Sequence, residues 1–165
     1  MATVYLQGNE CHTNGTLPEV GQQIPDFNLF NIKLKEKTLS SFSGKSKLIY
    51  SVSSLDTMVC ANTTHTLNEL AANVTNSEIL VVSADLPFAQ QRIKKQNKLK
   101  NVTLLSMMRD RKFAEDYGIL LIDGALAGLA TRAVFVTDAD NNLIYKELVN
   151  DITESPDFNQ ALKHL

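Results

Sequence analysis

The stretch KLIYSVSSLDTMVCANTTHTLNELAANVTN, residues 47–76, contains the patterns of a strand, a loop and a helix in direct succession. Residues 47–52 form an apolar run rich in β-formers, which predicts a strand buried on both faces. From Thr57 to Asn76 the apolar side chains recur with a period of 3.6 residues, which predicts a helix with one buried face. That face carries Val59, Thr63, Leu67, Leu70, Ala71 and Val74. A buried strand that leads straight into a helix is typical of α/β folds.

The same alternation continues along the rest of the chain. Further strands are predicted at residues 27–32, 37–39, 78–84, 102–105, 133–136 and 143–148, and helices at 87–98, 111–117 and 156–165. A turn at Gly8-Asn9 predicts an N-terminal β-hairpin that runs through Thr13. Helices between apolar strands indicate a central mixed, mostly parallel sheet with flanking helices, and the late hairpin adds antiparallel edge strands. We expect a thioredoxin-like α/β fold, although other doubly wound folds share this element order.

Length and charge restrict the function. A chain of 165 residues fits a single domain, residues 1–165, because domains cluster near about 100–150 residues. The net charge of −2 lacks the clustered positive charge that nucleic-acid binding needs. No apolar run approaches the roughly 20 residues of a membrane span, and the first residues do not form a secretory leader. With only two cysteines, Cys11 and Cys60, we expect free thiols in a cytoplasmic protein with no nucleic-acid or membrane partner.

The familiar cofactor and metal motifs are incomplete. Gly44-Lys45-Ser46 matches the end of a phosphate-binding loop, but the glycine required five residues before Gly44 is Leu39. The three histidines are scattered along the chain, which is untypical of a zinc site. We therefore expect neither a metal nor a cofactor.

Cys60 is the position where chemistry and geometry converge. It follows a strand and a short loop and lies in the opening turn of the predicted helix, where unpaired amide groups favour a thiolate over a thiol. A buried structural cysteine is the alternative interpretation. Thr57 replaces the first cysteine of a C-x-x-C dithiol, and its hydroxyl can turn toward the sulfur. His65 is rotated about 140° from Cys60 around the helix, so we expect it to face solvent rather than to act as a base.

Three motifs in this order resemble one family. Residues 53–60, SSLDTMVC, resemble the signature P-S-x-D-T-x-V-C, and SADLPFAQ at 83–90 and GLATRAVFV at 128–136 are similar to two further signatures. Over its whole length the chain resembles the bacterial thiol peroxidases of the peroxiredoxin superfamily. The resemblance implies a thioredoxin-like peroxiredoxin fold that reduces hydrogen peroxide or organic hydroperoxides through a Cys60 sulfenic acid.

The resemblance also assigns roles to individual residues. Cys60 would attack the peroxide, while the Thr57 hydroxyl, the Cys60 N–H and the Arg132 guanidinium would stabilise the developing charge. Pro87 and Phe88 would contact the tail of an organic peroxide. Without the resemblance, Arg132 could form a surface salt bridge and Thr57 a plain helix N-cap. A homodimer with its interface near the site is implied, and the glycine- and leucine-rich segment 120–130 could line a pocket, an interface or an ordinary loop.

The chain departs from the family pattern at three positions. Ser53 replaces a proline that stiffens the loop, and Met58 replaces a glycine, which would put bulk beside the site. Lys94 occupies the position of the usual resolving cysteine, and the family places the hairpin with Cys11 away from the active site. We expect a one-cysteine mechanism with an external thiol reductant such as thioredoxin or a small thiol. The alternative is a catalytically weakened paralogue that acts as a redox sensor or interaction protein.

Overall fold

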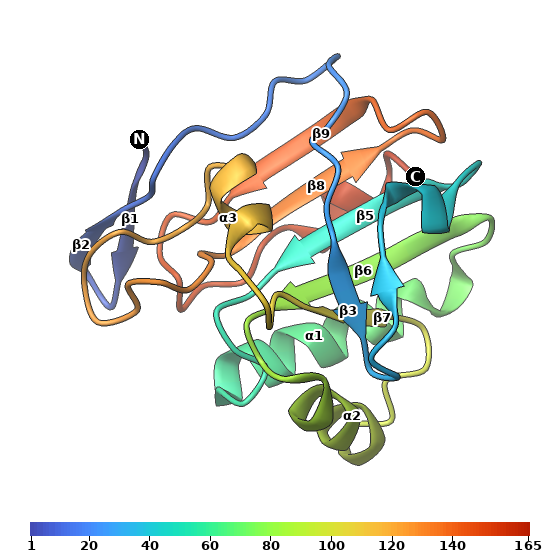
Figure 1. The fold of residues 1–165 in the computed structure, drawn as a ribbon, viewed down its shortest axis with the longest axis horizontal. Helices are drawn as coiled ribbons and strands as arrows, with labels where there is room; N and C mark the ends of the chain where they lie inside the picture. The colour runs from blue at the N-terminus through green and yellow to red at the C-terminus, as the bar shows by residue number, and fades with distance from the viewer.

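The computed structural model describes residues 1–165 and shows a large sheet with helices on both faces (Figure 1). The strands of this sheet are β3 (Leu29–Asn31), β4 (Glu36–Lys37), β5 (Ser46–Ser51), β6 (Ser77–Ser83), β7 (Thr103–Ser106), β8 (Ala133–Thr137) and β9 (Leu143–Leu148). The helices are α1 (Met58–Leu70), α2 (Pro87–Gln96), α3 (Lys112–Asp116) and α4 (Phe158–Leu162), with 3-10 turns at Leu39–Phe42 and Ala71–Asn73. A separate hairpin pairs β1 (Thr3–Leu6) with β2 (Asn9–His12), as the sequence predicts.

The direction of the strands differs from the expectation. The order is β4-β3-β7-β6-β5-β8-β9, and only the pairings β5–β6 and β6–β7 are parallel, while the other four are antiparallel. The prediction of a mixed sheet is confirmed, but the prediction that it is mostly parallel is wrong. Helices α1 and α2 connect the three parallel strands at the centre, and the hairpins β3–β4 and β8–β9 supply the antiparallel outer strands.

Alternating side chains of the central strands divide the core between the two faces of the sheet. On β5, Leu48 and Tyr50 pack with residues from α1, α2 and α4, whereas Ile49 packs on the opposite face with residues from α3. All three side chains are fully buried. A strand buried on both faces is a near-continuous apolar run, which explains why residues 47–52 were recognisable from sequence.

Helix ends deviate most from the sequence pattern. The α-helical part of the first predicted helix ends at Leu70 rather than Asn76, and a 3-10 turn continues it to Asn73. Val59, which the periodicity places on the buried face, is 39% exposed. The glycine that ends α3 is confirmed: Gly118 adopts φ +67°, and a side chain there would collide with the backbone of Thr16.

The N-terminal hairpin is attached to the segment that follows β9. The amide of Tyr5 donates to the Asn150 carbonyl oxygen at 2.8 Å, and the Ile152 amide donates to the Tyr5 carbonyl oxygen at 2.8 Å. The carboxylate of Asp151 accepts from the turn amides of Gln7 and Gly8, at 3.3 and 3.0 Å. These bonds fix the turn of the hairpin against the body of the protein. None of the helices is both long and apolar enough to cross a membrane.

This attachment predicts an acid-sensitive contribution to stability. Hydrogen bonds from the Thr153 side chain and amide, and from the Gly8 and Gln7 amides, lower the pKa of Asp151 from 3.8 to about 2. Because the folded-state pKa is the lower one, the stabilisation is complete above the unfolded-state pKa near 4 and is lost as the pH falls toward 2. We expect Asp151→Asn to lose less stability than the wild type between pH 4 and pH 2, measured by thermal unfolding. Parallel stability curves for the two proteins would contradict this assignment.

Candidate active site

Cys60 lies in the first turn of α1, directly after the loop that follows β5. Thr57 is the N-cap residue, and its Oγ1 accepts a hydrogen bond from the Cys60 amide at 3.3 Å. The Thr57 hydroxyl donates in turn to the Ser54 carbonyl oxygen at 3.1 Å. Cys60 is only 3% exposed. The sulfur therefore lies at the positive end of the helix, where amide dipoles stabilise negative charge.

Arg132 contacts this sulfur directly. Its Nη2 donates to Cys60 Sγ at 3.0 Å, and the arginine is only 1% exposed. Its Nη1 donates to the Glu154 carbonyl oxygen at 2.6 Å and to Thr63 Oγ1 at 3.3 Å. Arg132 thus forms no surface salt bridge, and its guanidinium is held in one orientation toward the thiol. A fixed cation at this distance stabilises a thiolate.

The pairing of β5 with β8 explains how residues so far apart in sequence meet. The two strands are antiparallel, with Ser51 opposite Ala133, so the start of β8 lies at the end of β5 that leads to Cys60. The Ser51 hydroxyl donates to the Thr131 carbonyl oxygen at 2.8 Å and accepts from the Ala133 amide at 3.1 Å. Both neighbours of Arg132 are therefore bound to the strand that carries the loop with Cys60.

A cavity of about 260 Å³ opens onto Cys60 and Arg132. Its exposed wall is almost entirely apolar. The other side chains that line it are Leu6, Gln7, Ser53, Ser54, Thr57, Val59, Leu126, Leu129, Ile152 and Thr153. The expectation that the N-terminal hairpin lies away from the site is therefore wrong, because the turn of the hairpin forms part of the wall.

The cavity shows which of the remaining predicted residues lie at the site. Segment 120–130 lines it through Leu126 and Leu129, as one of its three interpretations proposed. Pro87 and Phe88 are not among the lining residues: Pro87 is buried at the start of α2, and Phe88 is 65% exposed. Ile152 and the hairpin residues carried no recognisable sequence signal, since their role depends on contacts between distant segments.

The three departures from the family pattern have separate structural outcomes. Ser53 is buried, and its hydroxyl donates to the Ala130 carbonyl oxygen at 2.9 Å, so a hydrogen bond restrains the loop where a proline would have stiffened it. Met58 does not put bulk into the site, because it is 79% exposed and is not among the residues that line the cavity. Lys94 Nζ donates to the Val102 carbonyl oxygen at 2.9 Å, and burial lowers the pKa of Lys94.

The second thiol is also buried and unpaired. Cys11 packs with Val4, Leu121 and Ile152 in a small apolar cluster behind the cavity wall. Neither cysteine is in a disulfide. The structure therefore supplies no resolving thiol at the Lys94 position and holds Cys11 in an apolar cluster of its own.

No neighbouring side chain is suited to take a proton from Cys60. His65 is exposed, as predicted. Burial raises the pKa of Tyr50 well above its ordinary value, so this phenol, next to Arg132 and Cys60, stays neutral. The polar groups at the sulfur are therefore Arg132 and the amides at the start of α1.

Comparison with known proteins agrees with this geometry. The family model described as Redoxin matches residues 19–162. A thioredoxin-like sheet with a buried cysteine at a helix N-terminus, in contact with an arginine, defines the peroxiredoxin type of fold and site. The chain belongs to the redoxin family.

Similar proteins cover the whole chain. A thiol peroxidase of Corynebacterium glutamicum is 40% identical over 165 residues, which is 100% of this chain and 99% of that protein. A thiol peroxidase of Mycobacterium bovis is 42% identical with the same coverage. The crystal structure of a peroxiredoxin-like protein from Aquifex aeolicus superposes with a TM-score of 0.93 at 37% identity, covering 99% of this chain and 95% of that one.

Replacing Arg132 tests whether its contact with Cys60 stabilises the thiolate form of that cysteine. In Arg132→Met we expect Cys60 to react about 10- to 100-fold more slowly with a neutral alkylating reagent, since hydrogen bonds to charged groups contribute about 1.5–3 kcal/mol. Peptide mass spectrometry follows the reaction at Cys60, and circular dichroism checks folding. Arg109→Met removes an exposed ion pair with Glu36 and serves as the control. A folded Arg132→Met that alkylates at the wild-type rate contradicts the assignment.

Proposed function

We propose that the protein is a thiol peroxidase that reduces hydroperoxides through Cys60. The observation that carries this proposal is the 3.0 Å hydrogen bond from Arg132 Nη2 to Cys60 Sγ at the base of an open cavity. A buried cation on a cysteine at a helix N-terminus provides the activated nucleophile that peroxide reduction requires. The full-length relatives that are named thiol peroxidases support the same conclusion.

In the proposed reaction, the Cys60 thiolate attacks the terminal oxygen of a hydroperoxide. An S–O bond forms as the O–O bond breaks, and the leaving oxygen takes a proton to give water or an alcohol. The sulfur is oxidised by two electrons and the peroxide is reduced by two. An external thiol then attacks the sulfenic sulfur and releases water, and a second thiol cleaves the mixed disulfide to regenerate Cys60.

In this proposal, three donors stabilise the charge that develops on the two oxygens of the peroxide. Arg132 is already oriented toward the sulfur, and the Thr57 hydroxyl and Cys60 amide lie at the same helix end. Thr57 currently donates to the Ser54 carbonyl oxygen, so donation to a peroxide requires its hydroxyl to exchange that partner. Only Arg132 is preorganised as a donor that needs no reorganisation during the reaction, because the Cys60 amide also has a partner to exchange, Thr57 Oγ1.

The cavity favours organic hydroperoxides as substrates, in addition to hydrogen peroxide. Its apolar wall includes Leu126, Leu129 and Ile152, which can cover the hydrocarbon part of a small organic peroxide. We keep Pro87 and Phe88 as proposed contacts for the part of a longer substrate that extends beyond the cavity, because Phe88 is exposed at the start of α2.

The proposed turnover uses one cysteine and an external reductant, thioredoxin or a small thiol. Lys94 cannot form a disulfide, and Cys11 lies in its own apolar cluster. Free thiols suit a reducing cytoplasm, which we propose as the compartment.

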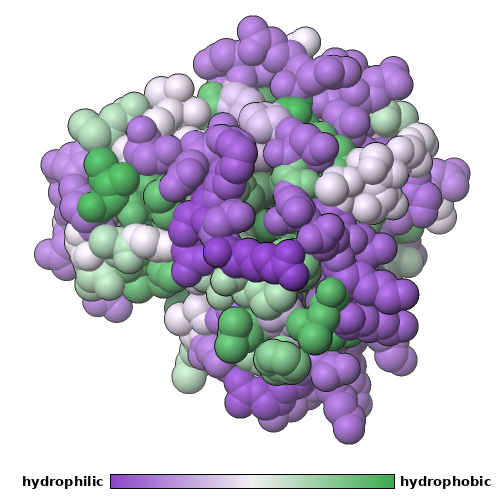
Figure 2. Space-filling view, in the orientation of Figure 1, coloured by the Kyte–Doolittle hydropathy of each residue, from purple (hydrophilic) through white to green (hydrophobic).

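We also propose a homodimer: Met58, Leu86 and Phe88 are exposed at the first turns of α1 and α2, and Figure 2 shows hydrophobic patches over the end of the molecule with α2.

A redox sensor is the second candidate function. The observation that favours it is Lys94 at the resolving position, because an oxidised Cys60 without an internal partner persists until an external thiol arrives. A sensor would form the sulfenic acid once per oxidation event, whereas a peroxidase turns over many times with a suitable thiol. Multiple turnover therefore distinguishes the two functions.

Of the two cysteines, only Cys60 is required for the proposed peroxidase activity. We expect Cys60→Ser to abolish thiol-dependent peroxide consumption, because serine is not ionised at neutral pH, and we expect Cys11→Ser to retain it. Peroxide consumption is measured with thioredoxin and with small thiols under matched conditions. If Cys60→Ser consumes peroxide like the wild type, the proposed function is wrong.

The apolar wall predicts a change in substrate selectivity. Leu126→Ser removes apolar contact area from the cavity, and burying a leucine side chain contributes about 1.5–3 kcal/mol. We expect kcat/KM for a bulky organic hydroperoxide to fall about 10-fold, while the value for hydrogen peroxide stays close to wild type. Equal losses for both substrates would show that Leu126 does not contact the organic part.

A further inference from the structure

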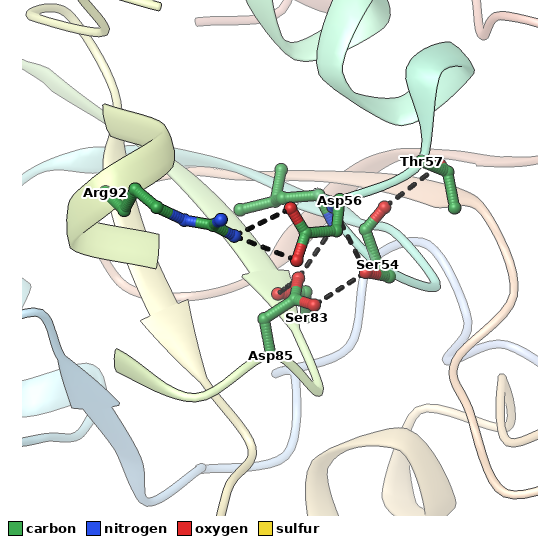
Figure 3. Close-up of polar contacts among 7 residues, drawn as sticks. Ser54, Asp56, Thr57, Ser83, Asp85 and Arg92 are labelled. Atoms are coloured by element: carbon green, nitrogen blue, oxygen red, sulfur yellow. Dashed lines mark hydrogen bonds and ion pairs between the residues drawn. The ribbon is translucent and has the colours of Figure 1, made fainter. Parts of the chain in front are cut away.

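The loop that precedes Cys60 is bound to a single carboxylate, that of Asp85 (Figure 3). Asp85 Oδ1 accepts from the Ser54 hydroxyl at 2.6 Å, and Oδ2 accepts from the Leu55 amide at 2.7 Å. The Ser83 hydroxyl also donates to Oδ2, at 2.7 Å. Three short donors on one carboxylate make a charge-assisted anchor for the loop.

Asp85 is itself attached to the ends of two central strands. Ser106, the last residue of β7, donates its hydroxyl to the Asp85 carbonyl oxygen at 2.5 Å. Gln90 on α2 donates to the Ser83 hydroxyl oxygen at 3.0 Å and to the Leu105 carbonyl oxygen at 2.9 Å. The carboxylate is therefore fixed relative to the sheet. Because the loop is bound to this carboxylate, the position of the loop is fixed as well.

A short series of hydrogen bonds connects Asp85 to the nucleophile. The Ser54 side chain binds Asp85, and the Ser54 carbonyl oxygen accepts the Thr57 hydroxyl. Thr57 Oγ1 then caps the Cys60 amide. The orientation of the Thr57 hydroxyl and of the first turn of α1 thus depends on where Ser54 is held.

We propose that Asp85 is a positioning residue for peroxide reduction, which holds residues 54–57 so that Thr57 and the Cys60 amide face the reacting oxygens. The inference rests on the proposed function. Asp85 does not line the cavity and does not contact the sulfur, so it acts through Ser54 and Leu55 rather than on the substrate. Because proximity effects are steep, a displacement of about 1 Å in this loop is sufficient to slow the reaction greatly.

An exposed ion pair on the same loop provides a matched comparison. Arg92 donates to the Asp56 carboxylate at 2.9 Å, but both side chains are more than half exposed. Figure 3 shows this pair beside the Asp85 cluster. Exposed ion pairs of this kind contribute little. Comparing the Asp85 contacts with the Arg92–Asp56 pair therefore distinguishes anchoring of the loop from a general effect of charge near the loop.

The test compares two reactions of Cys60 in the variant Asp85→Asn. The asparagine keeps the size of the side chain, but its amide nitrogen cannot accept the hydrogen bonds that a carboxylate oxygen accepts. We expect oxidation of Cys60 by hydrogen peroxide, followed by sulfenic-acid trapping and mass spectrometry, to slow about 10- to 100-fold. Alkylation by a neutral reagent needs the thiolate but not Thr57, and we expect it to be unchanged or faster.

Two further variants complete the test. Arg92→Gln is expected to match the wild type in both reactions. Ser54→Ala removes one of the three bonds to Asp85 and is expected to slow oxidation to a smaller extent, and the double variant Asp85→Asn/Ser54→Ala to be no slower than Asp85→Asn, since both changes break the same contact. Ser54→Ala keeps the proposal testable if Asp85→Asn does not fold.

The outcomes separate this inference from the proposed function. Wild-type rates of oxidation in folded Asp85→Asn and Ser54→Ala overturn the positioning role, as does an equal slowing of oxidation and alkylation. If Cys60 of the wild type is not oxidised by hydrogen peroxide, the proposed function itself fails, whatever the variants show.

Discussion

The hydrogen bond between Arg132 and Cys60 is the interaction on which the site depends. Both residues are almost inaccessible to solvent. A guanidinium removed from water is costly, and because the Arg132 Nε has no hydrogen-bond partner, the two terminal nitrogens make all of its hydrogen bonds. The Glu154 carbonyl oxygen and the Thr63 hydroxyl accept from Nη1, which leaves Nη2 directed at the sulfur. The capped helix and the apolar cavity surround a sulfur that this contact holds in place.

Strand direction makes that contact possible. Arg132 immediately precedes β8, and β8 runs antiparallel to β5. If β8 were parallel to β5, the residue before it would lie at the opposite end of the sheet from Cys60. The antiparallel pairing of β5 with β8 thus determines which side chains meet at the site.

The chain keeps the residues that we propose to act while a peroxide oxidises Cys60. Lysine occupies the position of the cysteine that would reduce the resulting sulfenic acid. Lys94 uses its amine in a bond to the Val102 carbonyl oxygen. Ser53 uses its hydroxyl to hold the loop to Ala130. Lys94 and Ser53 thus form hydrogen bonds of their own, and the Cys60–Arg132 contact is present beside them.

Local sequence patterns determined the strand at 47–52, the helix that begins beside Cys60, the Thr57 cap and the glycine that ends α3, because each depends on neighbouring residues. Motif resemblance, rather than periodicity, indicated Arg132. Only the tertiary structure decided the strand directions, the exposure of Val59 and Met58, and the approach of the N-terminal hairpin to the cavity through Leu6 and Gln7. Those features arise from packing and hydrogen bonds between segments distant in the chain, such as Tyr5 with Asn150, and a periodic pattern in one segment contains no information about its distant partner.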